Sequence, residues 1–222
     1  MSKVSKLGLV AIIICLGSSY VSASEDLWFT DVSFVNFKHK SKESTQTFDI
    51  NGFPSGSFES KHKKNDNGIA FGLESLQIDE KWRSFTHGAQ ESLRVEGELS
   101  SELKIFDAVS TKGVRLGDFT FYSGGGLKYI DINHDSAFLP FVRQQVVVSL
   151  LRANSYGVDA FLRGDLNFGL GGEIANGYEL KTGLQITFAP TVAVEIAGGT
   201  KHFNTQNDVD SKFFNVGLKK VF

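Results

Sequence analysis

Charged side chains stand at every even position but one, Ser100, between residues 93 and 105 of this sequence. Most odd positions hold leucine, valine, isoleucine or glycine, and the even positions hold Arg94, Glu96, Glu98, Glu102 and Lys104. A β-strand gathers such charges on one face, whereas a helix would spread them around its circumference. Carboxylates and cations held side by side form charge-assisted hydrogen bonds. The stretch therefore predicts a strand with one ion-pairing face.

The same alternation returns in the second half of the chain. Apolar residues or glycine alternate with polar ones from 158 to 170 and again from 178 to 188, which predicts a hairpin with one apolar and one charged face. A soluble β-sandwich gives this pattern too, with its charged face in water. The charged residues on this face of the later strands are Asp159, Arg163, Asp165, Glu179, Lys181, Glu195 and Lys201.

Nucleophilic catalysis has one candidate pair, His134 and Ser136, near the end of a predicted strand. This His-x-Ser pair resembles the catalytic residues of outer-membrane lipid A deacylases, which implies hydrolysis of an acyl ester. A serine hydrolase also needs an acid that orients its base. No acid occurs from 146 to 151, where the resemblance places it, and Ala137 stands in place of the family's asparagine. The alternative is a loop histidine and serine without a catalytic role, and we expect no enzyme.

No cofactor or metal is expected. The five histidines are scattered without the spacing of metal ligands. The glycines at 124–126 lack the helix that a phosphate-binding loop would open, so they predict a bend or room for a bulky neighbour. His39 and His62 stand among lysines at the two ends of the stretch from 38 to 67. That basic cluster is either a contact for lipopolysaccharide phosphates or another acidic ligand, or a solvated loop base.

The N-terminal segment, residues 1–23, has the features of an export signal. Lys3 and Lys6 precede an apolar run of ten residues, and Val21-Ser22-Ala23 is a small-residue cleavage site, which predicts a mature chain of 24–222. Cys15 would be removed with the signal. The remaining 21 basic and 25 acidic residues give a formal charge of −4, so nucleic acid is not an expected partner. No later apolar run is long enough for a helical membrane span.

The mature chain predicts one all-β domain with a long loop at 38–67 and a turn at 110–113. With both chain ends on one side, the number of strands is even. The clearest segments give eight, and counting 68–78 as a strand requires a partner at 82–87 and gives ten, which we favour. The expected strands are 28–37, 68–78, 82–87, 93–105, 117–133, 141–152, 157–170, 178–188, 192–201 and 213–222.

Aromatic residues near the strand ends indicate which face is enclosed. They resemble the interfacial girdles of membrane barrels and comprise Trp28, Tyr122, Tyr129, Tyr178, Phe188, Phe203 and Phe222. The last strand resembles the C-terminal assembly signal of Gram-negative outer-membrane barrels, through Phe214, Val216, Leu218 and Phe222. Lys220 departs from that pattern with a charge on the outward face.

Together these features resemble the small barrels of the outer-membrane-protein-A and opacity types. The resemblance implies a transmembrane antiparallel up-and-down β-barrel in the Gram-negative outer membrane, exported through the periplasm, with the loop at 38–67 outside the cell. Its expected partners are outer-membrane lipid, lipopolysaccharide and the barrel-assembly machinery. The expected role is structural or surface interaction, with the twelve strand charges in a lumen network. The alternative is a narrow, weakly selective channel lined by the same residues.

Overall fold

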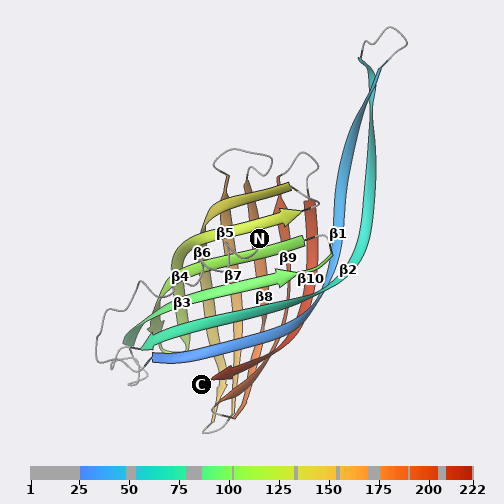
Figure 1. The fold of residues 1–222 in the computed structure, drawn as a ribbon. Helices are drawn as coiled ribbons and strands as arrows, with labels where there is room; N and C mark the ends of the chain where they lie inside the picture. The colour runs from blue at the N-terminus through green and yellow to red at the C-terminus, as the bar shows by residue number, and fades with distance from the viewer. Residues whose placement is uncertain are drawn as a thin grey trace, which may run out of the picture.

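Ten antiparallel strands form one closed sheet in a computed structural model of the chain (Figure 1). The structure describes residues 26–48, 54–78, 87–101, 103–132, 135–153, 156–169, 176–189, 191–204 and 209–221. The strands are β1 (Asp26–Phe48), β2 (Pro54–Ile78), β3 (His87–Leu99), β4 (Leu103–Leu116), β5 (Phe119–Ile132), β6 (Asp135–Arg152), β7 (Gly157–Phe168), β8 (Asn176–Ala189), β9 (Val192–Phe203) and β10 (Val209–Val221).

Each strand pairs with its neighbours along the chain, and the pairing of β1 with β10 closes the barrel. That closing register runs from Phe29 opposite Val221 to Ser41 opposite Val209. Closure gives the backbone amides of the barrel wall partners on both sides and removes its edges. The predicted all-β up-and-down barrel of ten strands is therefore confirmed. None of the described residues forms a helix long and apolar enough to cross a bilayer.

The predicted single strand at 93–105 is wrong, because the chain turns inside it. The Ser100 amide donates to the Leu103 carbonyl at 2.9 Å, and the amide and hydroxyl of Ser101 both donate to Asp66 Oδ2 at 2.9 Å. Desolvation raises the pKa of Asp66, but these hydrogen bonds outweigh it and lower the pKa overall. The carboxylate of Asp66 on β2 therefore holds the turn that joins β3 and β4.

The turn predicted at 110–113 is also wrong. These residues lie within β4, and the chain reverses instead at Gly117, whose φ of 63° is the left-handed conformation that glycine adopts without strain. The predicted strand at 82–87 falls outside the described residues except for His87, which begins β3. Ten strands is the right number, but two of them come from dividing 93–116 differently.

The long loop predicted at 38–67 is, over its described residues, a continuation of β1 and β2. The two strands stay paired from Asp26 opposite Gln77 to Phe48 opposite Pro54, so the hairpin extends well beyond the barrel wall (Figure 1). Its polar residues gave no hydrophobic alternation to detect. Backbone pairing between the two strands holds the extension.

The barrel has an apolar outer face, and its charged side chains point inward, as the alternation predicts. Leu166 is 58% exposed and its neighbour Asp165 only 1%. Leu99 and Leu184 are likewise exposed on the outer face, together with phenylalanines, valines and isoleucines of the other strands. A dry core made of these leucines, as in a soluble sandwich, is not what the chain forms.

Only part of the predicted aromatic girdle faces outward. Tyr178 and Phe188 are exposed on the outer face and Tyr129 is half-buried there. Tyr122 lines a cavity inside the barrel and Phe203 is fully buried in the lumen, so these two assignments are wrong. The side chains of Trp28 and Phe222 lie outside the described residues.

Glycines 124 and 126 allow β4 and β5 to approach closely. A Cβ on Gly126 would lie 2.0 Å from the Ala108 carbonyl oxygen, and one on Gly124 would lie 2.0 Å from that of Ser110. Backbone cannot yield as a flexible side chain can. The glycines therefore permit local bending of the sheet.

We predict that Gly126→Ala destabilises the barrel by about 1–3 kcal/mol, because the two strands must separate to admit the methyl group. Gly164→Ala is the matched control, since the nearest atom to its added Cβ is 4.0 Å away. Urea unfolding of the purified barrel, followed by tryptophan fluorescence, measures both. Equal stability of the two variants would contradict the close approach.

Candidate functional site

The lumen is divided into three levels along the barrel axis. At the end where the β1–β2 hairpin projects, an apolar plug fills it, made of Val35, Phe37, Leu103, Ile105, Ile130, Ile132, Leu139, Phe203, Val209 and Phe213. Below the plug lies a layer of ion pairs. Nearer the chain termini is a cavity of about 300 Å³, the vestibule, which none of the plug residues lines. The interior is thus closed at one end and hollow toward the other.

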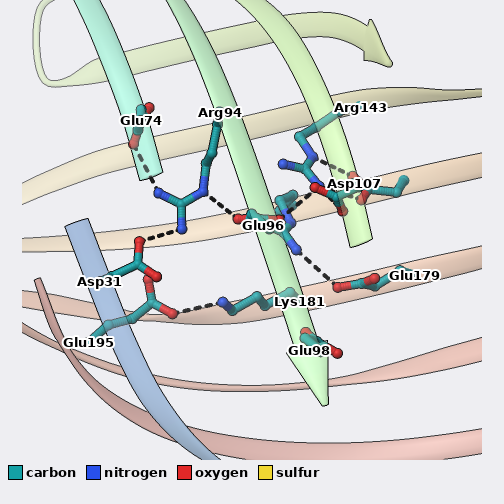
Figure 2. A network of polar contacts seen from close by, with 12 residues as sticks. Asp31, Glu74, Arg94, Glu96, Glu98, Asp107, Arg143, Glu179, Lys181 and Glu195 are labelled. Carbon is teal, nitrogen blue, oxygen red and sulfur yellow. Dashed lines mark hydrogen bonds and ion pairs between the residues drawn. The ribbon is translucent and has the colours of Figure 1, made fainter. Parts of the chain in front are cut away.

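Glu96 on β3 is the centre of the ion-pair layer. It accepts hydrogen bonds from three guanidinium groups, those of Arg94, Arg143 at 3.2 Å and Arg163 at 3.0 Å, which come from β3, β6 and β7 (Figure 2). Planar guanidinium groups suit such shared acceptors because their donors point in fixed directions. One carboxylate therefore connects strands from opposite sides of the barrel.

Arg94 extends the network to the seam where the barrel closes. It donates to Asp31 of β1 at 2.5 Å and to Glu74 of β2 at 3.0 Å (Figure 2). Lys219 of β10 reaches the same Glu74 at 3.3 Å. The first, second and last strands are thereby joined through side chains as well as through backbone pairing.

Lys128 on β5 is the most enclosed cation, with none of its side chain exposed. Its ammonium lies 3.3 Å from Asp165, 3.4 Å from Glu179 and 3.8 Å from Asp107. Arg143 shares Asp165 with it at 2.8 Å. A buried charge is tolerable only when it is paired in this way.

The ion-pair network consists of eight carboxylates and seven cations among the described residues. Every strand supplies at least one of them. The carboxylates are Asp31, Glu74, Glu96, Glu98, Asp107, Asp165, Glu179 and Glu195, and the cations are Arg94, Lys128, Arg143, Arg163, Lys181, Lys201 and Lys219. Lys181 binds Glu195 at 2.7 Å, and Lys201 binds Glu98 and lies 3.4 Å from Glu179. This arrangement can hold strands together and fill the lumen.

The structure brings nine of the twelve charged residues proposed from the sequence into this network: Arg94, Glu96, Glu98, Arg163, Asp165, Glu179, Lys181, Glu195 and Lys201. Asp159 also faces inward, where it lines the vestibule and accepts a 2.7 Å hydrogen bond from Ser149. Glu102 lies outside the described residues.

Lys104 is wrongly placed by the sequence pattern. Its side chain is 52% exposed on the outer face, where it pairs with Asp131 at 3.2 Å. The turn at Ser100 and Ser101 changes which positions face inward, from even in β3 to odd in β4. A pattern carried straight through 93–105 cannot register that change.

Six network members were not anticipated: Asp31, Glu74, Asp107, Lys128, Arg143 and Lys219. The rule that neighbouring residues of a strand point to opposite faces could have found several of them. Lys128 lies between Leu127 and Tyr129, whose outward direction the sequence already indicates, so it must point inward. Arg143 follows in the same way from Val142.

The proposed catalytic pair is not assembled in the described part of the chain. Ser136 lies exposed on the outer face of β6, opposite Asp131 in register, and His134 lies outside the described residues. Among the residues that the structure describes, no group of histidine, cysteine, aspartate and glutamate could hold a metal ion.

Known proteins resemble this chain in structure only. The sequence matches no protein-family model and no curated protein. An outer membrane channel from Pseudomonas putida F1 has a TM-score of 0.45 at 9% identity, over 92% of this chain and 98% of that one.

Two further structures are similarly distant. The translocator domain of the autotransporter NalP from Neisseria meningitidis has a TM-score of 0.36 at 7% identity, over 98% of this chain and 95% of that one. The outer membrane protease OmpT from Escherichia coli has a TM-score of 0.34 at 12% identity, over 92% of this chain and 99% of that one. Similarity this low transfers no activity. The class is that of closed ten-stranded antiparallel β-barrels, and the strand pairing itself defines it.

We predict that Lys128→Met destabilises the barrel by about 3–5 kcal/mol, because the change leaves buried carboxylates without a cation. Lys104→Met, which removes an exposed pair on the outer face, should change stability by at most about 1 kcal/mol. Urea unfolding distinguishes the two. Adding Glu179→Gln to Lys128→Met should recover part of the loss, and failure to do so would indicate a packing defect instead of charge imbalance.

Proposed function

We propose that the chain is an integral β-barrel of the Gram-negative outer membrane that does not catalyse a reaction. In this proposal the barrel anchors the β1–β2 hairpin outside the bilayer, where the hairpin makes surface contacts. One observation carries the membrane assignment: large apolar side chains cover the outer face while the charges are enclosed. Such a surface is unfavourable in water but matches hydrocarbon.

A closed barrel is also what the bilayer requires of a sheet. Backbone amides in hydrocarbon have no water to bind, so each must pair within the protein. The register of β1 with β10 meets that requirement at the seam. Val32, Phe34, Val216 and Leu218 are exposed on the outer side of the same seam, so the apolar surface continues across it.

Several finer features belong to this proposal. Residues 1–23 act as a cleaved export signal, and the resemblance to the outer-membrane-protein-A and opacity types describes the general class of barrel. Phe214, Val216, Leu218 and Phe222 act as the assembly signal, and the first three share the outer face of β10. Both chain ends then lie in the periplasm, as does the short connection at 190–191.

The closed lumen favours an anchoring role over an open channel. The apolar plug and the ion-pair layer occupy the half of the barrel nearer the hairpin, without a large cavity among the described residues there. The vestibule is the observation that favours the second candidate, a narrow channel. The vestibule already leaves space in the other half of the lumen. A continuous pore would therefore require only the plug and the ion-pair layer to move.

Leu162→Arg tests the membrane assignment. Leu162 is exposed on the outer face near the middle of β7. We expect the variant to weaken folding into phosphatidylcholine vesicles by about 2–4 kcal/mol, because it puts a charge on the lipid face near the middle of the bilayer. Ser136→Arg, on the same face at the start of β6, should have an effect of about 0–1 kcal/mol. Heat-dependent gel mobility reports the folded fraction. Equal folding of both variants and wild type in water without lipid would indicate a soluble barrel.

Planar-bilayer recordings separate the anchor from the channel. We expect the wild-type barrel to show no steady conductance, and Phe37→Ala combined with Phe203→Ala to produce discrete steps, because truncation opens the plug. Tyr178→Ala, on the outer face, is the control for the loss of an aromatic ring. Regular conductance steps from the wild-type barrel would support the channel.

A further inference from the structure

Four lysines lie together on the outer face at the base of the projecting hairpin. We call Lys38 and Lys40 of β1, Lys63 of β2 and Lys212 of β10 the lysine ladder, and all four are exposed. They come from three adjacent strands at the seam of the barrel.

The register places these lysines opposite one another. Lys38 faces Lys212 across the β1–β10 pair, and Lys40 faces Lys63 across the β1–β2 pair. The backbone register continues with Lys42 opposite Lys61. Like charges directly opposite on a sheet are destabilising. An anion bound between them would relieve that repulsion.

The ladder begins directly above the apolar band. Phe34 lies opposite Ile69 and Val216. The next row of outward residues contains Asn36, Asn67 and Phe214, and the Asn36 side chain donates to that of Asn67 at 2.8 Å. Lys38 and Lys212 form the row after that. Two residues of strand span about 7 Å, or about 5 Å of height in a tilted barrel strand.

That height corresponds to the headgroup layer of a bilayer. The polar layer on each side of the hydrocarbon is about 5–8 Å thick. In the proposed orientation the first row of the ladder therefore lies where the phosphates of neighbouring lipids lie, beside the barrel and not above its mouth.

The lysines have no ion-pair partner among the described residues. Asp210 lies opposite Lys40 in register, but it binds His202 Nδ1 at 2.7 Å. Lys104 is the contrasting case on the same outer face, because Asp131 neutralises it at 3.2 Å. The ladder thus combines positive charge, exposure and the right depth without an internal counter-ion in the described chain.

We infer that the lysine ladder binds the phosphate groups of an anionic lipid in the adjacent leaflet, which in the outer leaflet of the outer membrane is lipopolysaccharide. This inference rests on the proposed membrane location. Paired ammonium groups bracket a phosphate, while the outward apolar rows of β1 and β10 contact its acyl chains. The Asn36 and Asn67 side-chain amides lie between the lysines and the apolar rows.

Titration of the folded full-length barrel in neutral detergent with fluorescent bis-phosphorylated lipid A tests the inference by anisotropy. The combined variant Lys38→Gln, Lys40→Gln, Lys63→Gln and Lys212→Gln should bind at least about tenfold more weakly, since a single lysine near an anionic surface contributes about fivefold. Lys104→Gln is the matched control and should bind as wild type does. Inorganic phosphate should compete only at far higher concentration.

Wild-type binding that is equally strong for dephosphorylated lipid A would overturn the inference. Unchanged affinity in the combined variant would overturn it too, provided that heat-dependent gel mobility shows the variant folded. Insertion into phosphatidylcholine vesicles is measured in parallel. A barrel that inserts but ignores the phosphates refutes the lysine ladder alone, whereas a barrel that stays in water refutes the proposed function.

Discussion

The enclosure of paired charges inside a closed sheet is the constraint on which the rest of this structure depends. Because Glu96 bridges three arginines and Arg94 reaches both β1 and β2, the strands are fixed in register by side chains as well as by amides. A slip of one residue would turn a strand's charges outward and its apolar residues inward. Every strand contributes a charge to the network, so each strand must turn its charged face inward. The apolar outer face follows directly from it.

The sequence was most informative where alternation is clean on both faces. In β7, Leu166 and Asp165 have opposite chemistry, so the period identifies the strand and its two sides. The signal fails near the plug, where inward residues such as Phe37 and Phe203 are as apolar as outward ones. It also fails in the hairpin extension, where the strands are paired although the sequence shows no apolar alternation. The division of 93–116 failed because the alternation looks continuous across the turn at Ser100 and Ser101, and Asp66, which holds Ser101, is distant in the sequence.

The membership of the ion-pair layer could be predicted in part, but its pairing could not. The alternation of side-chain direction along a strand assigns Arg163, Glu179 and Lys201 to the inner face. It does not show that Arg94 binds Asp31, 63 residues away, or that Lys219 binds Glu74, 145 residues away. Those contacts depend on how the closed sheet brings opposite walls together. The separation of plug, ion pairs and vestibule likewise emerges only when all ten strands are placed.

The β1–β2 extension leaves the barrel as a two-stranded ribbon with both outer margins unpaired. Beyond Ser41, where the pairing with β10 ends, seven further residues of β1 lead to Phe48, a reach of about 24 Å. Unpaired strand margins invite the addition of another strand, and natural proteins discourage this with charge. The lysines and glutamates along the ribbon suit that purpose. In the proposed membrane location, this charge would keep the ribbons of neighbouring copies from pairing into a continuous sheet.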